Sequence, residues 1–330
     1  MRPPEFWKHE RGKESAPALR ALLTPASWAY AWAGAERLRK AAPHRVTRPV
    51  ICVGNLTLGG SGKTPVVRAL RAITADMGVA AHTLSRGHGG KLAGPLRVDP
   101  ARHTAAEVGD EPLLHAGDGP AWIARDRAAG AEAAIAAGAA AIVMDDGFQN
   151  PMLAKDLSIL VFDAPAGLGN GRVFPAGPLR EPLAAGLARA DLVILMGSAE
   201  TPAWFAGFTG PIVHGVLTAL ERAPPGPLLA FAGIGRPEKF FASLADAGGD
   251  VMDGEAFPDH HRYTPGELHA LERSALRRSA RLITTEKDHV RLPRAWAGRV
   301  ATFPVHAAFE NEAPLRAALE RVLNRPGEAR

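Results

Sequence analysis

The chain has 330 residues, of which 46% are apolar and 22% charged, as is typical of a globular protein of about two domains. A single cysteine, Cys52, excludes an internal disulfide and argues against a cysteine-based zinc site, so a reducing compartment fits best. The net charge is +5, yet residues 1–48 carry ten Lys and Arg against four Asp and Glu, a net of +6. Because nothing beyond this segment extends the basic patch, we expect no nucleic-acid binding.

Residues 1–45 combine this charge with aromatic and large aliphatic side chains. The chain starts with charged residues where a signal peptide would need an apolar stretch, and the uncharged run at 21–35 is too short, and interrupted by Pro25, to span a bilayer. We expect an amphipathic N-terminal helix that either lies on an anionic membrane surface or packs on the protein's own body. The side chains concerned are Phe6, Trp7, Leu22, Leu23, Trp28, Tyr30 and Trp32.

From residue 46 onward, apolar runs of strand length alternate with helix-like segments. Continuous apolar strands separated by helices predict parallel sheets covered on both faces, an α/β/α sandwich. The linker-like sequence RAPPGP at 222–227 divides a nucleotide-binding domain at 46–221 from a smaller α/β domain at 222–330. The predicted strands are 50–53, 80–84, 141–144, 158–162, 192–196, 212–216, 228–232, 281–284 and 301–305. The predicted helices are 63–76, 127–137, 237–247, 265–277 and 312–323.

A glycine-rich loop, GNLTLGGSGKTP at residues 54–65, lies between a predicted strand and a predicted helix. The usual phosphate loop has Gly, four residues and then Gly-Lys-Ser/Thr, and Thr57 stands where the first glycine would be. The remaining glycines would still let backbone N–H groups turn toward phosphate oxygens at the start of a helix. Lys63 would reach the β- and γ-phosphates and the Thr64 hydroxyl would take one Mg²⁺ position, so we favour a phosphate site over a plain turn. The loop glycines are Gly59, Gly60 and Gly62.

Two adjacent carboxylates, Asp145 and Asp146, end the predicted strand 141–144, at the sheet edge where α/β proteins bind ligands. Adjacent acids repel each other unless a cation offsets them, so the pair favours a Mg²⁺ site over a helix cap or turn. Asp110 and Glu111 precede an apolar, helix-like run, where Asp110 is either a helix cap or a catalytic base.

Three further polar segments are less specific. FPDHHRY at 257–263 brings Asp259, His260 and His261 together, and a histidine there could orient a carboxylate or share its proton, although an ordinary polar loop is the alternative. SRGHGG at 85–90 and GNGRVFPAGPLREP at 169–182 offer charged groups to phosphates or an anionic substrate, and both could also be surface turns.

Taken together, these stretches resemble the tetraacyldisaccharide 4′-kinase family, the lipid A kinases of Gram-negative bacteria. The resemblance covers nearly the whole chain, and the family's loop normally lacks the first glycine, so Thr57 is a family trait. One departure is His88, where the family more often has tyrosine. The matching motifs are LLTPASWAYAW in the leader, then VGNLTLGGSGKTP, SRGHGG, VGDEP, DDGFQ, GNGRVFPAGPLREP, GIGRP, FPDHHRY and TTEKD.

The resemblance implies an enzyme that moves the γ-phosphate of ATP, with Mg²⁺, to the 4′-hydroxyl of a tetraacyldisaccharide 1-phosphate, giving lipid IVA in lipid A biosynthesis. It implies a phosphate-loop α/β/α domain and a smaller α/β domain joined by a short strand linker, with the active site in the cleft between them. It also implies a peripheral position on the cytoplasmic face of the inner membrane, and we expect a monomer.

The family's site residues are carried over motif by motif. Lys63 and Thr64 would bind the phosphates and Mg²⁺, with Ser61 in the loop, and Asp145 and Asp146 would serve the metal. Asp110 would take the proton from the sugar hydroxyl. Its supporting histidine would be His260, because it directly follows Asp259, with His261 as the alternative. The residues expected to line the substrate cleft are Arg86, Glu111, Gln149, Arg180, Glu181 and His261.

Two rival functions fit parts of the sequence. A phosphate-loop ATPase or GTPase switch, or a metallochaperone, would act on a protein partner and need no sugar acceptor. Against it, Glu286 replaces the lysine of a guanine-specific element in TTEKD, and Leu58 stands where partner-loading ATPases often carry a second lysine. A soluble small-molecule kinase would leave the aromatic leader unexplained.

Overall fold

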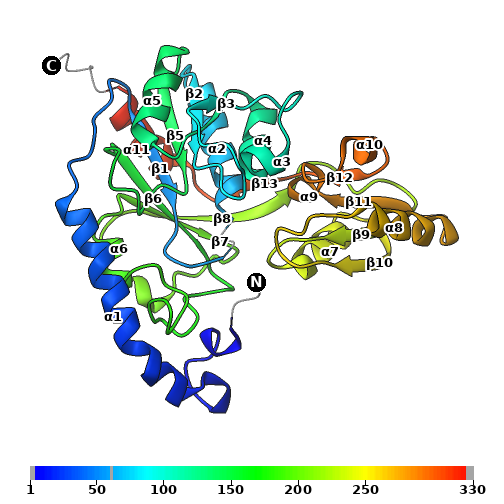
Figure 1. The fold of residues 1–330 in the computed structure, drawn as a ribbon, viewed down its shortest axis with the longest axis horizontal. Coiled ribbons are helices and arrows are strands. Elements are labelled where there is room, and N and C mark those ends of the chain that lie inside the picture. The colour runs from blue at the N-terminus through cyan, green and yellow to red at the C-terminus, as the bar shows by residue number, and fades with distance from the viewer. Residues whose placement is uncertain (1–3, 60–61, 325–330) are drawn as a thin grey trace.

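The computed structural model describes residues 4–59 and 62–324, which form two sheets of nine and four strands (Figure 1). The strands of the larger sheet are β1 (Val50–Gly54), β2 (Ala81–Ser85), β3 (Leu96–Arg97), β4 (Ala121–Ile123), β5 (Ala141–Asp145), β6 (Leu157–Asp163), β7 (Leu192–Met196), β8 (Ile212–Ala219) and β13 (Val305–Phe309). Their order is β13-β8-β7-β6-β1-β5-β2-β4-β3, parallel except at β13–β8 and β3–β4. The predicted α/β class with a large, mostly parallel sheet is confirmed.

Helices cover both faces of the larger sheet because its central strands are apolar on both sides. Ile51 and Val53 of β1 face one hydrophobic cluster, which α2 and α11 complete, whereas Val50 and Cys52 face a second, which includes α5, α6 and η3. The helices of this unit are α2 (Lys63–Asp76), α3 (Ala105–Val108), α4 (Asp110–Asp118), α5 (Arg127–Ala136), α6 (Leu183–Leu187), η3 (Ala203–Phe205) and α11 (Ala313–Leu323).

The smaller sheet is parallel throughout, with the order β10-β9-β11-β12. Its helices α7 and α8 pack into different hydrophobic clusters. Its elements are β9 (Pro227–Ala232), α7 (Pro237–Asp246), β10 (Asp250–Ala256), α8 (Pro265–Arg277), β11 (Arg281–Thr285), α9 (Glu286–His289), α10 (Arg294–Ala297) and β12 (Ala301–Phe303). β10 was not predicted because this edge strand is polar and largely exposed, so it lacks an apolar run.

The predicted strand at 301–305 is two strands. The strand is interrupted at Pro304, which has no N–H to donate to a neighbouring strand. β12 therefore ends in the smaller sheet, and β13 begins in the larger one. Residues 305–323 therefore pack with the larger unit, which differs from the sequence-based boundary that placed all of 222–330 together. Two antiparallel strands, β8 and β13, run between the units (Figure 1).

The leader forms helix α1 (Pro17–Lys40), which runs along the outside of the larger unit (Figure 1). The prediction of an amphipathic helix is wrong. The charged residues of α1 lie toward its two ends, so residues 21–35 are uncharged on every side of the helix. Ser27 is buried and its Oγ accepts a hydrogen bond from the Ala176 N–H at 3.0 Å, whereas Trp28 and Trp32 are each 70% exposed. Among the described residues, no helix has the length and apolar character needed to cross a bilayer.

Candidate active site

The glycine-rich loop connects the buried strand β1 to α2, and its first residues are extended. Thr57 forms an antiparallel bridge with Leu179, and the Leu58 N–H donates to the Pro178 carbonyl at 2.8 Å. An extended, paired residue does not need the conformational freedom of glycine, which explains why threonine fits here. Gly62, with a φ of 76°, precedes the helix. Gly59 has a φ of 114°, and Gly60 and Ser61 lie outside the described residues.

Lys63 is the first residue of α2, and its ammonium group is held at the base of the loop. The Nζ atom donates to Asn55 Oδ1 at 3.1 Å and lies 3.5 Å from Asp146 Oδ1. Asn55 is fully buried and donates to the Thr57 carbonyl at 2.7 Å, so it fixes both the loop and the lysine. Thr64 follows as the second residue of the helix. Asn55 lies within the loop motif but was not among the predicted site residues.

Asp145 and Asp146 follow one another but point to different partners. Asp145 is 1% exposed, and its Oδ2 lies 2.8 Å from Nε2 of the buried His115, a partner that no sequence motif indicated. Its Oδ1 is buried and, within the described part of the chain, has no hydrogen-bond partner. Asp146 has a φ of 52° and accepts a hydrogen bond from Arg180 Nη1 at 3.0 Å. Burial raises the pKa of Asp146, but Lys63 and Arg180 outweigh it and the pKa is lowered.

Asp110, the first residue of α4, is 7% exposed and lies where the two units meet. Its Oδ2 accepts hydrogen bonds from Arg291 Nε at 2.9 Å and Nη2 at 2.5 Å, and lies 3.1 Å from His260 Nδ1. Burial favours the neutral acid, but the neighbouring donors and cations outweigh it and hold the pKa of Asp110 well below its usual range. These neighbours are His260, Lys287 and Arg291. Asp110 is therefore a carboxylate at neutral pH.

The two adjacent histidines point in different directions. His260 has a φ of 57°, in the left-handed region, and its ring contacts Asp110. His261 Nε2 lies 3.1 Å from both carboxylate oxygens of Glu267, and its ring stacks on Phe257 at 4.8 Å between centroids. The structure thus brings His260 to Asp110 and packs His261, a predicted cleft residue, inside the smaller unit.

The segment TTEKD supplies a buried carboxylate, Asp288, on which several hydrogen bonds converge. Asp288 is fully buried and accepts hydrogen bonds from Tyr263 Oη at 2.9 Å, Thr285 Oγ1 at 2.6 Å and the Gly233 N–H at 3.0 Å. It also accepts one from Arg291 Nη1 at 2.9 Å. Arg291 could not be predicted from the sequence, because it lies outside every motif and its partner Asp110 is far away in the chain.

The predicted cleft residues of the larger unit form a second chain of polar contacts. Gln149 Nε2 donates to the Asn55 carbonyl and to Glu181 Oε1, both at 3.0 Å. Glu181 Oε2 in turn accepts from Arg189 Nη2 at 2.5 Å, and Arg180 reaches Asp146. These hydrogen bonds hold the glycine-rich loop through Asn55 and the acidic pair through Asp146. Arg86 is exposed just after β2.

The SRGHGG loop lies against the Asp110 segment. A Cβ atom on Gly109 would come within 2.5 Å of the His88 carbonyl, so only glycine fits between the two loops. The His88 and His260 rings are 6.4 Å apart between centroids. His88 therefore stands beside the Asp110–His260 pair.

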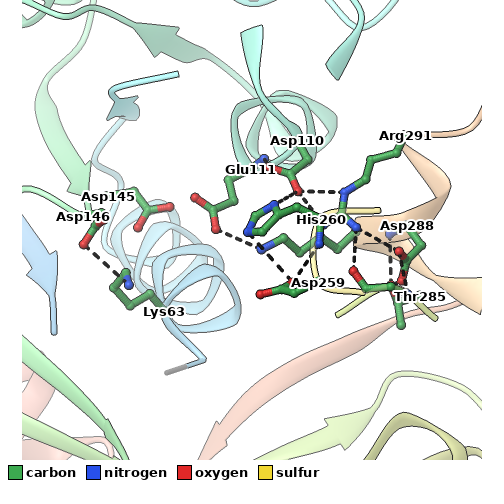
Figure 2. A network of polar contacts seen from close by, with 12 residues as sticks. Lys63, Asp110, Glu111, Asp145, Asp146, Asp259, His260, Thr285, Asp288 and Arg291 are labelled. Carbon is green, nitrogen blue, oxygen red and sulfur yellow. Dashed lines mark hydrogen bonds and ion pairs between the residues drawn. The ribbon is translucent and has the colours of Figure 1, made fainter. Parts of the chain in front are cut away.

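Charged pairs also join the two units around this site. Lys287 Nζ lies 3.1 Å from Glu111 Oε1, and Arg68 Nη1 of α2 lies 2.8 Å from Glu286 Oε2. Figure 2 shows two clusters of polar side chains. Lys63, Asp145 and Asp146 form one, and the network around Asp110 forms the other. In this view Glu111 lies between them. Lys63 and the glycine-rich loop thus lie on one side of Glu111, and the Asp110 carboxylate lies on the other.

A cavity of about 400 Å³ lies at the carboxyl ends of β6 and β7. A Cβ atom on Gly62 would lie 3.9 Å from Cγ of Met196 at the end of β7, so the cavity borders the end of the phosphate loop. Asp163, at the end of β6, pairs with Arg236 and Lys239 of the smaller unit. The lining residues are Ala164, Pro165, Gly197, Ser198, Glu200, Thr201 and Pro202.

The chain is similar to known proteins over nearly its whole length. The family model described as LpxK, tetraacyldisaccharide-1-P 4′-kinase, matches residues 19–324. A tetraacyldisaccharide 4′-kinase of Hyphomonas neptunium is 52% identical over 99% of this chain and 100% of its own, and one of Rhodospirillum centenum is 53% identical over 98% and 97%. The solved structure of LpxK from Aquifex aeolicus, described as an "apo" form in complex with ATP, matches with a TM-score of 0.74 and 27% identity, covering 92% of this chain and 99% of that one.

Proposed function

Because this chain belongs to the tetraacyldisaccharide-1-phosphate 4′-kinase family, we propose how its residues divide the work of that reaction. The enzyme is an ATP-dependent kinase that phosphorylates the 4′-hydroxyl of a tetraacyldisaccharide 1-phosphate, a lipid A precursor. These roles are assigned from one observation. Lys63 lies at the phosphate loop, and it faces Asp110, which is hydrogen-bonded to Arg291 of the smaller unit. Turnover of the Asp110 and Lys63 variants, described in the Discussion, tests it.

Lys63 binds the β- and γ-phosphates of ATP in this proposal. Its present partners, Asn55 and Asp146, place the ammonium group where the glycine-rich loop and the start of α2 converge. Backbone N–H groups of the loop and the positive end of the helix dipole add to the attraction for phosphate. As the γ-phosphate is transferred, Lys63 stabilises the negative charge on its oxygens.

Mg²⁺ would be held by Asp145, Asp146 and Thr64. These residues fit the ion because Asp145 Oδ1 is buried without a hydrogen-bond partner in the described ranges. Residues 4–59 and 62–324 contain no cluster of three or more His, Cys, Asp or Glu suited to a metal. The two carboxylates and the Thr64 hydroxyl suit Mg²⁺, because this ion keeps several waters and binds one or two carboxylates together with phosphates. When bound, Mg²⁺ would neutralise charge on the phosphates.

Asp110 accepts the proton of the acceptor hydroxyl as its oxygen bonds to phosphorus. Although its depressed pKa makes the carboxylate a weak base, the transition state of phosphoryl transfer is loose, so the hydroxyl loses its proton late and a well-placed weak base suffices. His260 of the smaller unit supports the carboxylate by a hydrogen bond to Oδ2. The disaccharide would lie between the two groups of Figure 2, next to Glu111 and Arg180.

The adenosine part of ATP would occupy the cavity at the ends of β6 and β7. Ligands of parallel sheets bind outside the carboxyl ends of the strands, and this cavity borders the phosphate loop on the side of β1 away from Asp145 and Asp146. The metal and the acceptor would then bind on the other side of β1, at the end of β5. Arg236 and Lys239 of the smaller unit reach the same end of β6 through Asp163.

Filling this cavity is expected to weaken ATP binding selectively. Thr201 lines it, and Thr201→Trp should raise the KM for ATP about tenfold, equivalent to ~1.4 kcal/mol, with little change in the KM for the lipid. Steady-state kinetics with each substrate varied in turn gives both constants, and Thr218→Trp on the exposed part of β8 is the matched control. An unchanged KM for ATP in Thr201→Trp would exclude the cavity as the adenosine site.

Helix α1 would attach the enzyme to the cytoplasmic surface of the inner membrane. Its uncharged middle presents Leu22, Trp28 and Trp32 to solvent at 70% exposure or more, and its last turn carries Arg37, Arg39 and Lys40. Exposed Trp and Leu beside basic residues suit an anionic interface, where the indole rings enter the headgroup layer. All the groups assigned above come from one chain, so we propose that a monomer is sufficient.

Removing the exposed tryptophans is expected to reduce membrane binding without harming the active site. The double variant Trp28→Ser/Trp32→Ser should bind vesicles that contain phosphatidylglycerol at least about tenfold more weakly in sedimentation, because each buried indole contributes about 1.5–3 kcal/mol. Leu276→Ser, at a residue of the smaller unit that is 72% exposed, is the control and should bind like wild type. Equal vesicle binding by the double variant and wild type would contradict the role of α1.

A further inference from the structure

We propose that Arg291 is a positioning residue for the reaction: it orients the Asp110 carboxylate so that Oδ1, and not Oδ2, meets the acceptor hydroxyl. This inference rests on the proposed role of Asp110 as base. It adds the group that sets the orientation of the base and the oxygen that takes the proton.

The contacts of Asp110 are divided unequally between its two oxygens. Oδ2 accepts from Arg291 Nε at 2.9 Å and Nη2 at 2.5 Å, and also faces His260 Nδ1 at 3.1 Å. Oδ1 accepts from the backbone N–H of Glu111 at 3.0 Å. With three donors gathered on Oδ2, its lone pairs are engaged, and Oδ1 keeps the capacity to accept a further proton.

Arg291 is itself fixed by the smaller unit. Its side chain is 5% exposed, and Nη1 donates to Asp288 Oδ1 at 2.9 Å and to the Gly233 carbonyl at 2.8 Å. Asp288 is in turn held by Tyr263 and Thr285, so its carboxylate has little freedom to rotate. Because a guanidinium is planar, bonds on one edge set the direction of the other, and the edge that faces Asp110 is fixed by the interior of the smaller unit.

This connection crosses from one unit to the other. Asp110 begins α4 of the larger unit, whose His115 contacts Asp145, whereas Arg291 follows α9 of the smaller unit. The same stretch, 286–291, also supplies the Lys287–Glu111 and Arg68–Glu286 pairs. The base therefore has its orientation set by one unit and its distance from the phosphate loop set by the other.

The contribution of Arg291 is geometric more than electrostatic. Lys287 already places a positive charge near Asp110, and its ammonium group bonds to Glu111. A lysine at position 291 would keep the charge but could not donate two N–H bonds from a rigid guanidinium edge to Oδ2 while also holding Asp288. The conservative variant therefore separates orientation from charge.

Steady-state kinetics of Arg291→Gln, Arg291→Lys, Asp110→Asn and the double variant Arg291→Gln/Asp110→Asn would test this role. Arg291→Gln should lower kcat about 100-fold with the KM for ATP changed less than about twofold, because a misplaced base affects the chemical step. Arg291→Lys should fall between this variant and wild type. In the Asp110→Asn background, Arg291→Gln should cost nothing further, because both residues act through one group. Arg278→Gln, at the exposed residue that follows α8, is the matched control.

The outcomes separate this inference from the role of Asp110. Wild-type turnover by Arg291→Gln, beside a strongly reduced kcat for Asp110→Asn, would overturn the positioning role alone. A further decrease in the residual kcat of Asp110→Asn on adding Arg291→Gln would do the same. An active Asp110→Asn would overturn the base assignment on which the inference rests. If Arg291→Gln does not fold, Arg291→Lys decides: kcat at least about fivefold lower with an unchanged KM for ATP supports the role, and wild-type kcat refutes it.

Discussion

Replacing Asp110 with alanine is expected to lower kcat for lipid phosphorylation about 10²–10⁴-fold, while ATP binding stays nearly intact. A sugar hydroxyl has a very high pKa, so its proton needs an acceptor as the bond to phosphorus forms. Asp110 contacts Arg291, His260 and Glu111 rather than the phosphate loop, so its loss should leave the nucleotide site in place. Single-turnover phosphorylation and equilibrium binding of an ATP analogue measure the two effects separately.

The control for this variant is Asp246→Ala, at the exposed end of α7, which should retain full activity. Normal turnover by Asp110→Ala would remove Asp110 from the mechanism. A loss of ATP affinity as large as the loss of kcat would show instead that the variant damages the docking of the two units.

Lys63→Ala is expected to have an effect at least as large, about 10³-fold or more on kcat/KM, because it removes the cation that stabilises the transferred phosphate. Lys63→Arg keeps the charge but moves its donors, and should recover only a small part of the activity. The readout is initial rate at several ATP concentrations, and Lys91→Ala, at an exposed residue, is the control. Activity within a few-fold of wild type would show that phosphate binding depends on the backbone of the loop alone.

The local parts of this site could be predicted from the sequence. The strand, loop and helix that carry Lys63 are contiguous, and the acids at 145–146 end an apolar run, so elementary patterns indicate both. Thr57 is instructive because the strict motif fails at this position while the structure shows an extended residue bridged to Leu179. The strict motif describes one backbone conformation of the loop, and pairing with a neighbouring segment can stabilise a different one.

The long-range parts could not be predicted in this way. His115 meets Asp145, and Arg291 meets Asp110, through packing between elements that no sequence pattern joins. The choice between His260 and His261 depends on the left-handed backbone of His260, which directs adjacent side chains apart. The break at Pro304 likewise decides which sheet each half of the apolar run joins, and an apolar pattern alone cannot distinguish the two sheets.

Transfer of label from γ-labelled ATP to tetraacyldisaccharide 1-phosphate in detergent micelles with Mg²⁺ should be measured first, for wild type, Lys63→Ala and Asp110→Ala in parallel. We expect labelled lipid with wild type, with the phosphate on the 4′-hydroxyl, and almost none with either variant. Consumption of ATP by wild type without labelled lipid, or equal labelling by all three proteins, would contradict this expectation.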